Sequence, residues 1–113
     1  MEPRIAASVL ATGLIRKAEG EGGFGAVLAK GDPTAGSILV ILLERGGNPR
    51  LFERLLEVDG RYAWREAAGS KLENRSPVPE LIAQRRRFDP DLWVLELDIP
   101  CVERFAAEMN ELR

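Results

Sequence analysis

The chain of 113 residues contains no histidine and only one cysteine, Cys101. Histidine is the commonest general base and the commonest metal ligand in proteins, so its absence excludes the usual chemistry of many hydrolases and metalloenzymes. Without an imidazole in the same chain, Cys101 cannot serve as the nucleophile of a Cys–His pair. A lone cysteine also forms no disulfide within the chain, as is typical of the reducing cytoplasm. We therefore expect a cytoplasmic protein with no catalytic residue, no metal and no cofactor.

The chain also lacks a surplus of positive charge and an apolar run long enough to cross a membrane. Lys and Arg number 16 against 18 Asp and Glu, a formal net charge of −2, so no basic field attracts nucleic acid or anionic lipid. The apolar run from Ile5 to Ile15 has the length of a signal-peptide core, but its residues recur with helical spacing. We predict an amphipathic helix there, and binding to neither nucleic acid nor membranes.

The remaining composition is that of a globular domain. Apolar residues make up 45% and charged residues 30% of the chain, and its length is near the commonest domain size. We therefore expect a single domain over residues 1–113. Hydrophobic patterning predicts the element order α-β-β-β-β-α-β-α. The predicted helices cover residues 7–18, 78–88 and 101–113, and the predicted strands cover residues 24–30, 37–44, 50–58, 61–66 and 92–98.

The strand pattern predicts the fold class. Ile38–Leu43 is a run of six apolar residues, and Leu92–Leu97 begins in the same way, which indicates central strands buried on both faces. Turn residues such as Asp59-Gly60 separate the strands of residues 24–67, so we expect an antiparallel meander of four strands there. The prediction is an α+β fold (an α/β sandwich), with a mixed, mainly antiparallel five-stranded sheet and three helices.

The stretch KGDPTAGSIL (residues 30–39) has two glycines with four residues between them, the spacing of a phosphate-binding P-loop. A P-loop needs a lysine and then a hydroxyl residue directly after the second glycine, followed by a helix. Here Ser37 and Ile38 follow Gly36, so the lysine is missing, and the next predicted element is a strand. Pro33 removes an N–H group, and Asp32 would repel a phosphate. We interpret the stretch as a hairpin loop, with glycines at positive φ and Asp32 bonded to local backbone.

Arg85, Arg86 and Arg87 lie in series near the end of the second predicted helix. They could bind an anion, or they could satisfy the helix dipole and form a structural ion pair. Successive helical residues point about 100° apart. We therefore place Arg85 at the edge of the apolar stripe of Val78, Leu81, Ile82 and Phe88, paired with Asp89 or Asp91, and expect Arg86 and Arg87 to be more exposed.

Three aspartates are the candidate carboxylates of a ligand, acid/base or metal site. Asp89 and Asp91 flank a proline in FDPD, and Asp32 lies in the glycine-containing loop. Aspartates are common in turns because they bond the local backbone. Two carboxylates without further ligands are a weak indication of chemistry, and the local role is the favoured interpretation.

Tyr62 and Trp64 share a face of the strand over residues 61–66, which follows the last hairpin and is expected at a sheet edge. Aromatic residues are favoured at interfaces, so these two are the candidate interface residues of a symmetric homodimer. Alternatively, both face the core of their own monomer. A second candidate surface is the apolar stripe of the last helix, formed by Val102, Phe105, Ala106, Met109 and Leu112.

The pieces KGDPTAGSILV, RYAW and QRRRFDPDLWVLELD resemble a family of small bacterial proteins known only as domain of unknown function 1491. The resemblance extends from Leu10 to Asp98, and RRFDPDLWV is its most specific part. It implies a single-domain cytoplasmic bacterial protein with an α/β sandwich, and it implies no activity. The positions that match the family pattern are Gly31, Asp32, Gly36, Trp64, Arg86, Phe88, Asp89, Pro90, Asp91 and Trp93.

These observations leave three functional hypotheses. The first is a non-enzymatic interaction or accessory module, because the usual catalytic groups are missing. The second is a small-molecule or anion-binding module that uses the Arg85–Arg87 region. The third is a carboxylate-dependent hydrolase with Asp32, Asp89 or Asp91 in its site. The corresponding partners are a second copy of the chain, an unknown protein or a small anion.

Overall fold

The computed structural model describes residues 5–67 and 72–112, and these form three helices and one five-stranded sheet. The order of the elements is the predicted one. Their bounds are α1 Ala7–Gly20, β1 Phe24–Ala29, β2 Ile38–Glu44, β3 Gly47–Leu56, β4 Tyr62–Glu66, α2 Val78–Phe88, β5 Trp93–Ile99 and α3 Val102–Leu112.

The strands lie in the order β1-β5-β2-β3-β4. β2 and β5 are parallel neighbours in the interior of the sheet, and every residue from Ile38 to Leu43 is buried. The central position predicted from their apolar runs is therefore confirmed, because only a strand covered on both faces needs such a run. β3 pairs antiparallel with β2 and with β4.

The predicted four-strand meander is wrong at its first strand. β1 pairs antiparallel with β5, and β5 separates it from β2. The physical reason lies in burial: β5 is buried on both faces, whereas Phe24, Val27 and Leu28 of β1 are exposed. The strand with the bulkier apolar side chains takes the interior position, and β1 is left at the edge.

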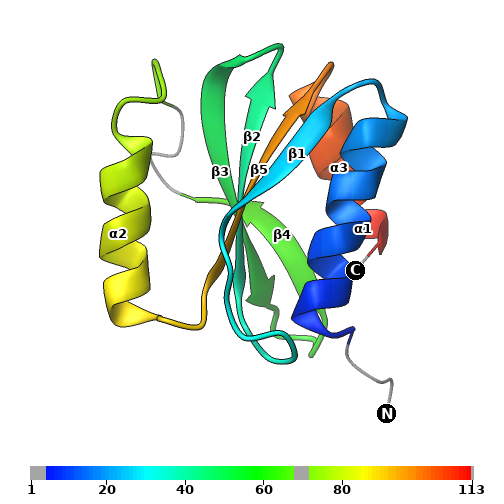
Figure 1. Cartoon of the computed structure of the whole chain (residues 1–113). Helices are drawn as coiled ribbons and strands as arrows, with labels where there is room; N and C mark the ends of the chain where they lie inside the picture. The colour runs from blue at the N-terminus through cyan, green and yellow to red at the C-terminus, as the bar shows by residue number, and fades with distance from the viewer. Residues whose placement is uncertain (1–4, 68–71, 113) are drawn as a thin grey trace.

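The helices cover the two faces of the sheet unequally. α1 and α3 lie on one face, and α2 lies alone on the other (Figure 1). Accordingly, the buried residues form two clusters, one containing Leu14, Leu95 and Phe105 and one containing Leu39, Val94 and Val78. No helix in the described part of the chain is long and apolar enough to cross a membrane.

The apolar stripe of α3 covers the sheet. Val102, Phe105 and Met109 are buried in the cluster on this face, and Ala106 packs against it. The side chain of Leu112, the last residue of the predicted stripe, lies outside the described part of the chain. These stripe residues therefore pack against the sheet of their own chain, so most of the stripe is not exposed to a second copy.

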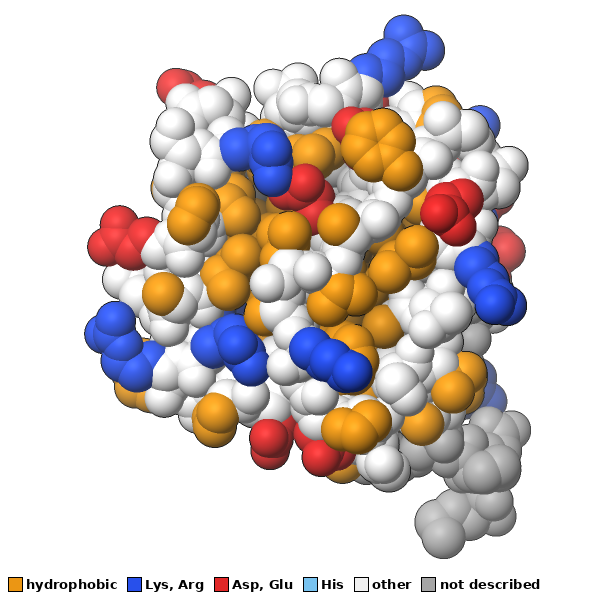
Figure 2. Space-filling view, viewed as in Figure 1, with side chains coloured by type: hydrophobic (Ala, Val, Ile, Leu, Met, Phe, Trp, Pro, Cys, Tyr) orange, Lys and Arg blue, Asp and Glu red, His pale blue; other side chains and the backbone are white. Residues whose placement is uncertain are grey.

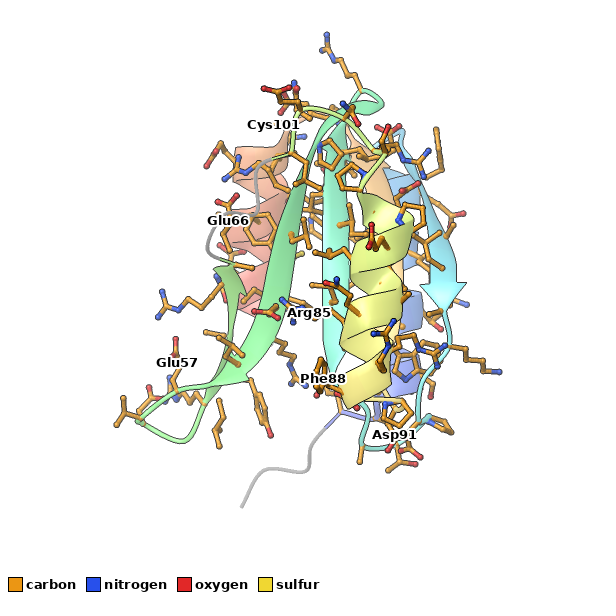
Figure 3. All side chains as sticks on the ribbon, turned by 90° about the vertical axis from the view of Figure 1, so that its left-hand side faces the viewer. Glu57, Glu66, Arg85, Phe88, Asp91 and Cys101 are labelled. Atoms are coloured by element: carbon orange, nitrogen blue, oxygen red, sulfur yellow. The ribbon has the colours of Figure 1, made fainter. Side chains whose placement is uncertain are left out.

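The predicted stripe of α2 is wrong at Phe88, whose side chain is 90% exposed. On a helix with about 100° per residue, Phe88 lies about 80° around the axis from the buried Val78, at the rim of the stripe. It is also the last residue of the helix, so no further turn packs beside it. Arg85, which lies nearer the middle of the stripe, takes the position over the sheet (Figure 3).

Candidate functional site

Most of the candidate ligand residues meet at one end of the sheet. We call residues 30–37 and 86–93 the loop cluster. The N–H of Asp32 donates to the carbonyl oxygen of Asp91 over 3.0 Å, and the N–H of Trp93 donates to that of Ser37 over 2.8 Å. These bonds join the connection between β1 and β2 to the turn between α2 and β5. The structure thus brings Asp32, Asp89 and Asp91 into one region, as a shared site would require.

The two glycines of the loop allow this close approach. A Cβ atom at Gly31 would lie 2.0 Å from the carbonyl oxygen of Asp91, and one at Gly36 would lie 2.4 Å from it. Neither glycine has a positive φ, so the expectation that they supply one is wrong. The segment is a turn, as predicted, but it is no hairpin loop, because β5 lies between the strands it connects.

Asp32 bonds the local backbone, as expected. Its Oδ2 accepts the N–H groups of Thr34 at 3.1 Å and Ala35 at 2.7 Å, and its carbonyl oxygen accepts Nε1 of Trp93 at 2.6 Å. The loop in turn satisfies the start of α1, whose first N–H groups donate to the carbonyl oxygens of residues 33 and 34. Helix N-termini leave such donors without a partner unless a cap satisfies them, and α1 has no side-chain cap.

Arg86 ties the two halves of the loop cluster together. Its Nη2 donates to the carbonyl oxygens of Lys30 and Pro90, each over 3.1 Å. The side chain is half-buried, so the sequence-based expectation of a more exposed residue is wrong. The reason is that both acceptors are backbone atoms, one of them 56 residues away. Side-chain patterns do not indicate such acceptors.

Arg85 extends from α2 toward the sheet (Figure 3) and bonds Glu53 of β3. The predicted partners, Asp89 and Asp91, are therefore wrong. They follow the end of α2, whereas Arg85 lies on the side of the helix that faces β3. Arg85 and Arg86 are half-buried, and Arg87 is exposed.

The aspartates of the FDPD turn have mostly local roles. Oδ1 of Asp89 accepts the N–H of Asp91 at 3.2 Å, an arrangement typical of aspartate turns. Among the residues that the structure describes, no group of three or more acidic or cysteine side chains is placed to hold a metal ion. The loop cluster therefore binds itself together, and its only exposed carboxylate is that of Asp91.

The candidate interface strand β4 is at a sheet edge, but its middle is already covered. Trp64 is 3% exposed and packs in the core. Asn110 of α3 bonds its backbone twice: Oδ1 accepts the N–H at 2.7 Å, and Nδ2 donates to the carbonyl oxygen at 3.4 Å. The amide thus replaces a neighbouring strand. The interface at Tyr62 and Trp64 stays a prediction. Trp64 faces the core of its own monomer, as the alternative interpretation expects.

A depression of about 400 Å³ opens at the other end of the sheet, beside Glu44, Arg50, Glu73 and Val102. Arg50 is its obvious anion-binding group. Its Nε and Nη2 donate to Glu66 over 2.8 and 2.7 Å, and its Nη1 donates to Glu103 over 2.6 Å. The hydrogen bonds to Glu66, followed by that to Glu103, raise the pKa of Arg50. Its charge is already matched by two carboxylates, so this arginine, the one cation among the described lining residues, is not free to bind an anion.

The family described as "Protein of unknown function (DUF1491)" matches residues 5–107. The chain belongs to the DUF1491 family. No curated protein matches it. The crystal structure of a DUF1491 family protein from Caulobacter crescentus CB15 is similar to it, with 31% identity, a TM-score of 0.79, and 90% of this chain and 94% of that chain covered.

Two structures determined in solution are also similar. An NMR structure of a DUF1491 family protein from the same organism shows 33% identity and a TM-score of 0.75, with 93% of this chain and 94% of that chain covered. A protein from A. tumefaciens shows 25% identity and a TM-score of 0.75, with 92% and 93% covered. The family and the fold inferred from FDPDLW and the neighbouring pieces are thus confirmed, and the family name carries no activity.

Proposed function

We propose that this DUF1491 protein is a non-enzymatic interaction module that binds a protein chain at β1. The observation that carries the proposal is the exposure of large apolar side chains on this strand: Phe24 is 66%, Val27 45% and Leu28 39% exposed. Phe24 lies on the face that α2 covers, whereas Val27, opposite Leu95, lies on the face that α1 covers, so apolar side chains are exposed on both sides of this edge strand. Exposed apolar surface on a small protein is typical of an interaction site. Hydrophobic side chains gather in a hollow between α2 and β1, bordered by charged residues (Figure 2).

The hollow follows from the uneven cover of the sheet. Gly25 faces α1, because a Cβ at that position would meet Ile15 and Leu97. Its neighbours Phe24 and Ala26 therefore point to the opposite face, where α2 is the one described helix. A single helix is about 10 Å wide with its side chains, whereas neighbouring strands lie about 4.8 Å apart. α2 therefore leaves the β1 side of this face open.

The two other hypotheses have less support. An anion site would need free arginines, but Arg85 bonds Glu53 and Arg86 bonds two backbone carbonyl oxygens. A hydrolase would pair carboxylates as acid and base, but Asp32 and Asp89 accept backbone N–H groups, which leaves Asp91 as the exposed carboxylate of the three. These bonds stabilise the loop cluster, whereas the exposed apolar side chains of β1 have no such role in the fold.

Photo-crosslinking in cells of the source organism tests the proposal. Benzoylphenylalanine replaces Phe24 in one variant and Leu56 in the control, since Leu56 is 61% exposed and lies on β3, away from β1. We expect light to produce a discrete adduct with a protein chain from position 24 and none from position 56. Equal adducts at both positions, or none at position 24, would contradict the proposal.

A further inference from the structure

We infer that the chain bound at β1 is a second copy of this protein, an inference that rests on the proposed function. The first step concerns the two edges of the sheet. β4 is closed by the bidentate contact from Asn110, and Arg65 and Glu57 form an ion pair beside it. Within the described residues, the outer edge of β1 has no comparable hydrogen-bond partner. One edge is protected against a further strand, and the other is open.

β1 also lacks the residues that usually protect an edge. Exposed edges commonly carry lysine, proline or a bulge, yet Phe24–Ala29 contains no charged residue and no proline. The strand has one bulge, between Val27 and Ala29. Phe24 to Val27 keep a regular register with β5, so this part of the edge presents regularly spaced N–H and C=O groups to another strand.

The strand is complementary to itself. In an antiparallel pairing about a two-fold axis centred on Ala26, Gly25 of each copy lies opposite Val27 of the other, and Phe24 lies beside the bulge at Leu28. Apolar residues then meet apolar residues, and no like charges oppose one another.

The exposed area sets the strength of this contact. The exposed fractions of Phe24, Val27 and Leu28 correspond to about 300 Å² of side chain per copy, less than the roughly 800 Å² per partner of a standard stable interface. Backbone pairing adds to this contact. The dimer is therefore weak and reversible, forming one continuous sheet from the five strands of each copy.

The test is the molar mass of the purified full chain, measured by light scattering from about 10 to about 500 µM, a range suited to weak contacts. The mass should rise from near 12.5 kDa toward twice that value. Ala26→Lys places two lysines opposite each other and should weaken association at least about tenfold. Leu56→Lys introduces the same charged side chain at an exposed position of β3, away from β1, and should leave the association unchanged.

A charge swap guards against misfolding of the variant. Ala26→Lys and Ala26→Glu, each monomeric alone, should associate when mixed, which a damaged fold could not do. A wild-type chain that stays monomeric at the highest concentration, or a dimer that Ala26→Lys leaves intact, overturns the inference. If the chain is monomeric while Phe24 still forms an adduct with a different protein in cells, the proposed interaction at β1 stands and only the second copy is wrong.

Discussion

Gly31→Ala should destabilise the protein more than its size suggests. The new Cβ would lie 2.0 Å from the carbonyl oxygen of Asp91, where ordinary contacts begin at 3.4 Å. The obstacle is backbone, so one of two chain segments must move by more than an ångström. Forced overpacking costs about 1–3 kcal/mol, and the movement also strains the Asp32–Asp91 backbone bond, which contributes about 1 kcal/mol. We expect a loss of about 2–4 kcal/mol.

Gly13→Ala is the matched control. Gly13 lies in α1, and a Cβ there would meet nothing within 4 Å. Because glycine is a poor helix former, the same substitution should stabilise the protein by about 0.5–1 kcal/mol. The two variants add the same methyl group. Changes of opposite sign in the free energy of unfolding would therefore be due to the close backbone contact at Gly31.

Urea unfolding followed by the fluorescence of Trp64 and Trp93 measures both effects, since both rings are buried. With a slope of about 1–3 kcal/mol per molar urea, the midpoint of Gly31→Ala should fall by about 1–2 M. The midpoint of Gly13→Ala should rise slightly. A Gly31→Ala protein with a wild-type midpoint would show that the loop cluster moves at little cost, and our account of these glycines would be wrong.

Three further outcomes follow from the contacts. Trp93→Ala should lose about 3–5 kcal/mol on urea unfolding because it empties a buried position, whereas Arg87→Ala, at an exposed position, should lose less than about 0.5 kcal/mol. Asn110→Ala should lose about 1–3 kcal/mol, since it leaves two backbone groups of β4 without their partner; an unchanged midpoint would mean that water replaces the amide. The hydrogen bond from Lys17 lowers the pKa of Glu21 against the opposing effect of burial. Its stabilisation is therefore complete above pH 4.5, the usual value, and is lost as pH falls through the lowered pKa. Unfolding of Glu21→Gln at a series of acidic pH values should show a shallower loss than wild type, and parallel curves would refute this assignment.

The two central strands could be predicted because their burial is a local property of the sequence. Ile38–Leu43 carries apolar residues at every position, and β5, which is also covered on both faces, carries them at all positions except Glu96 and Asp98. The partner of β1 could not be predicted in this way. It depends on which strand competes best for the interior edge of β2, and β5 lies about fifty residues further along the chain. Sequential neighbours pair often, but here a strand with bulkier apolar side chains took the position.

The charged candidates show the same limit. Helical spacing placed Arg85 at the edge of the apolar stripe of α2, but its partner Glu53 comes from a strand and lies 32 residues away in the sequence. The role of Arg86 was missed because its acceptors are backbone carbonyl oxygens. Asn110 was also missed, since a single asparagine near a helix end has no pattern. Its only indication in the sequence is a polar residue beside the apolar stripe of α3.

The residues that carry the family resemblance and the residues that form the open surface are different sets. Asp32, Arg86 and Trp93 bond other parts of the loop cluster and so stabilise the fold. Phe24 and Val27 contribute little to the core, because about half or more of each side chain is exposed. Structures at 25–33% identity retain this fold with TM-scores of 0.75–0.79. The fold therefore persists when about two thirds or more of the residues differ.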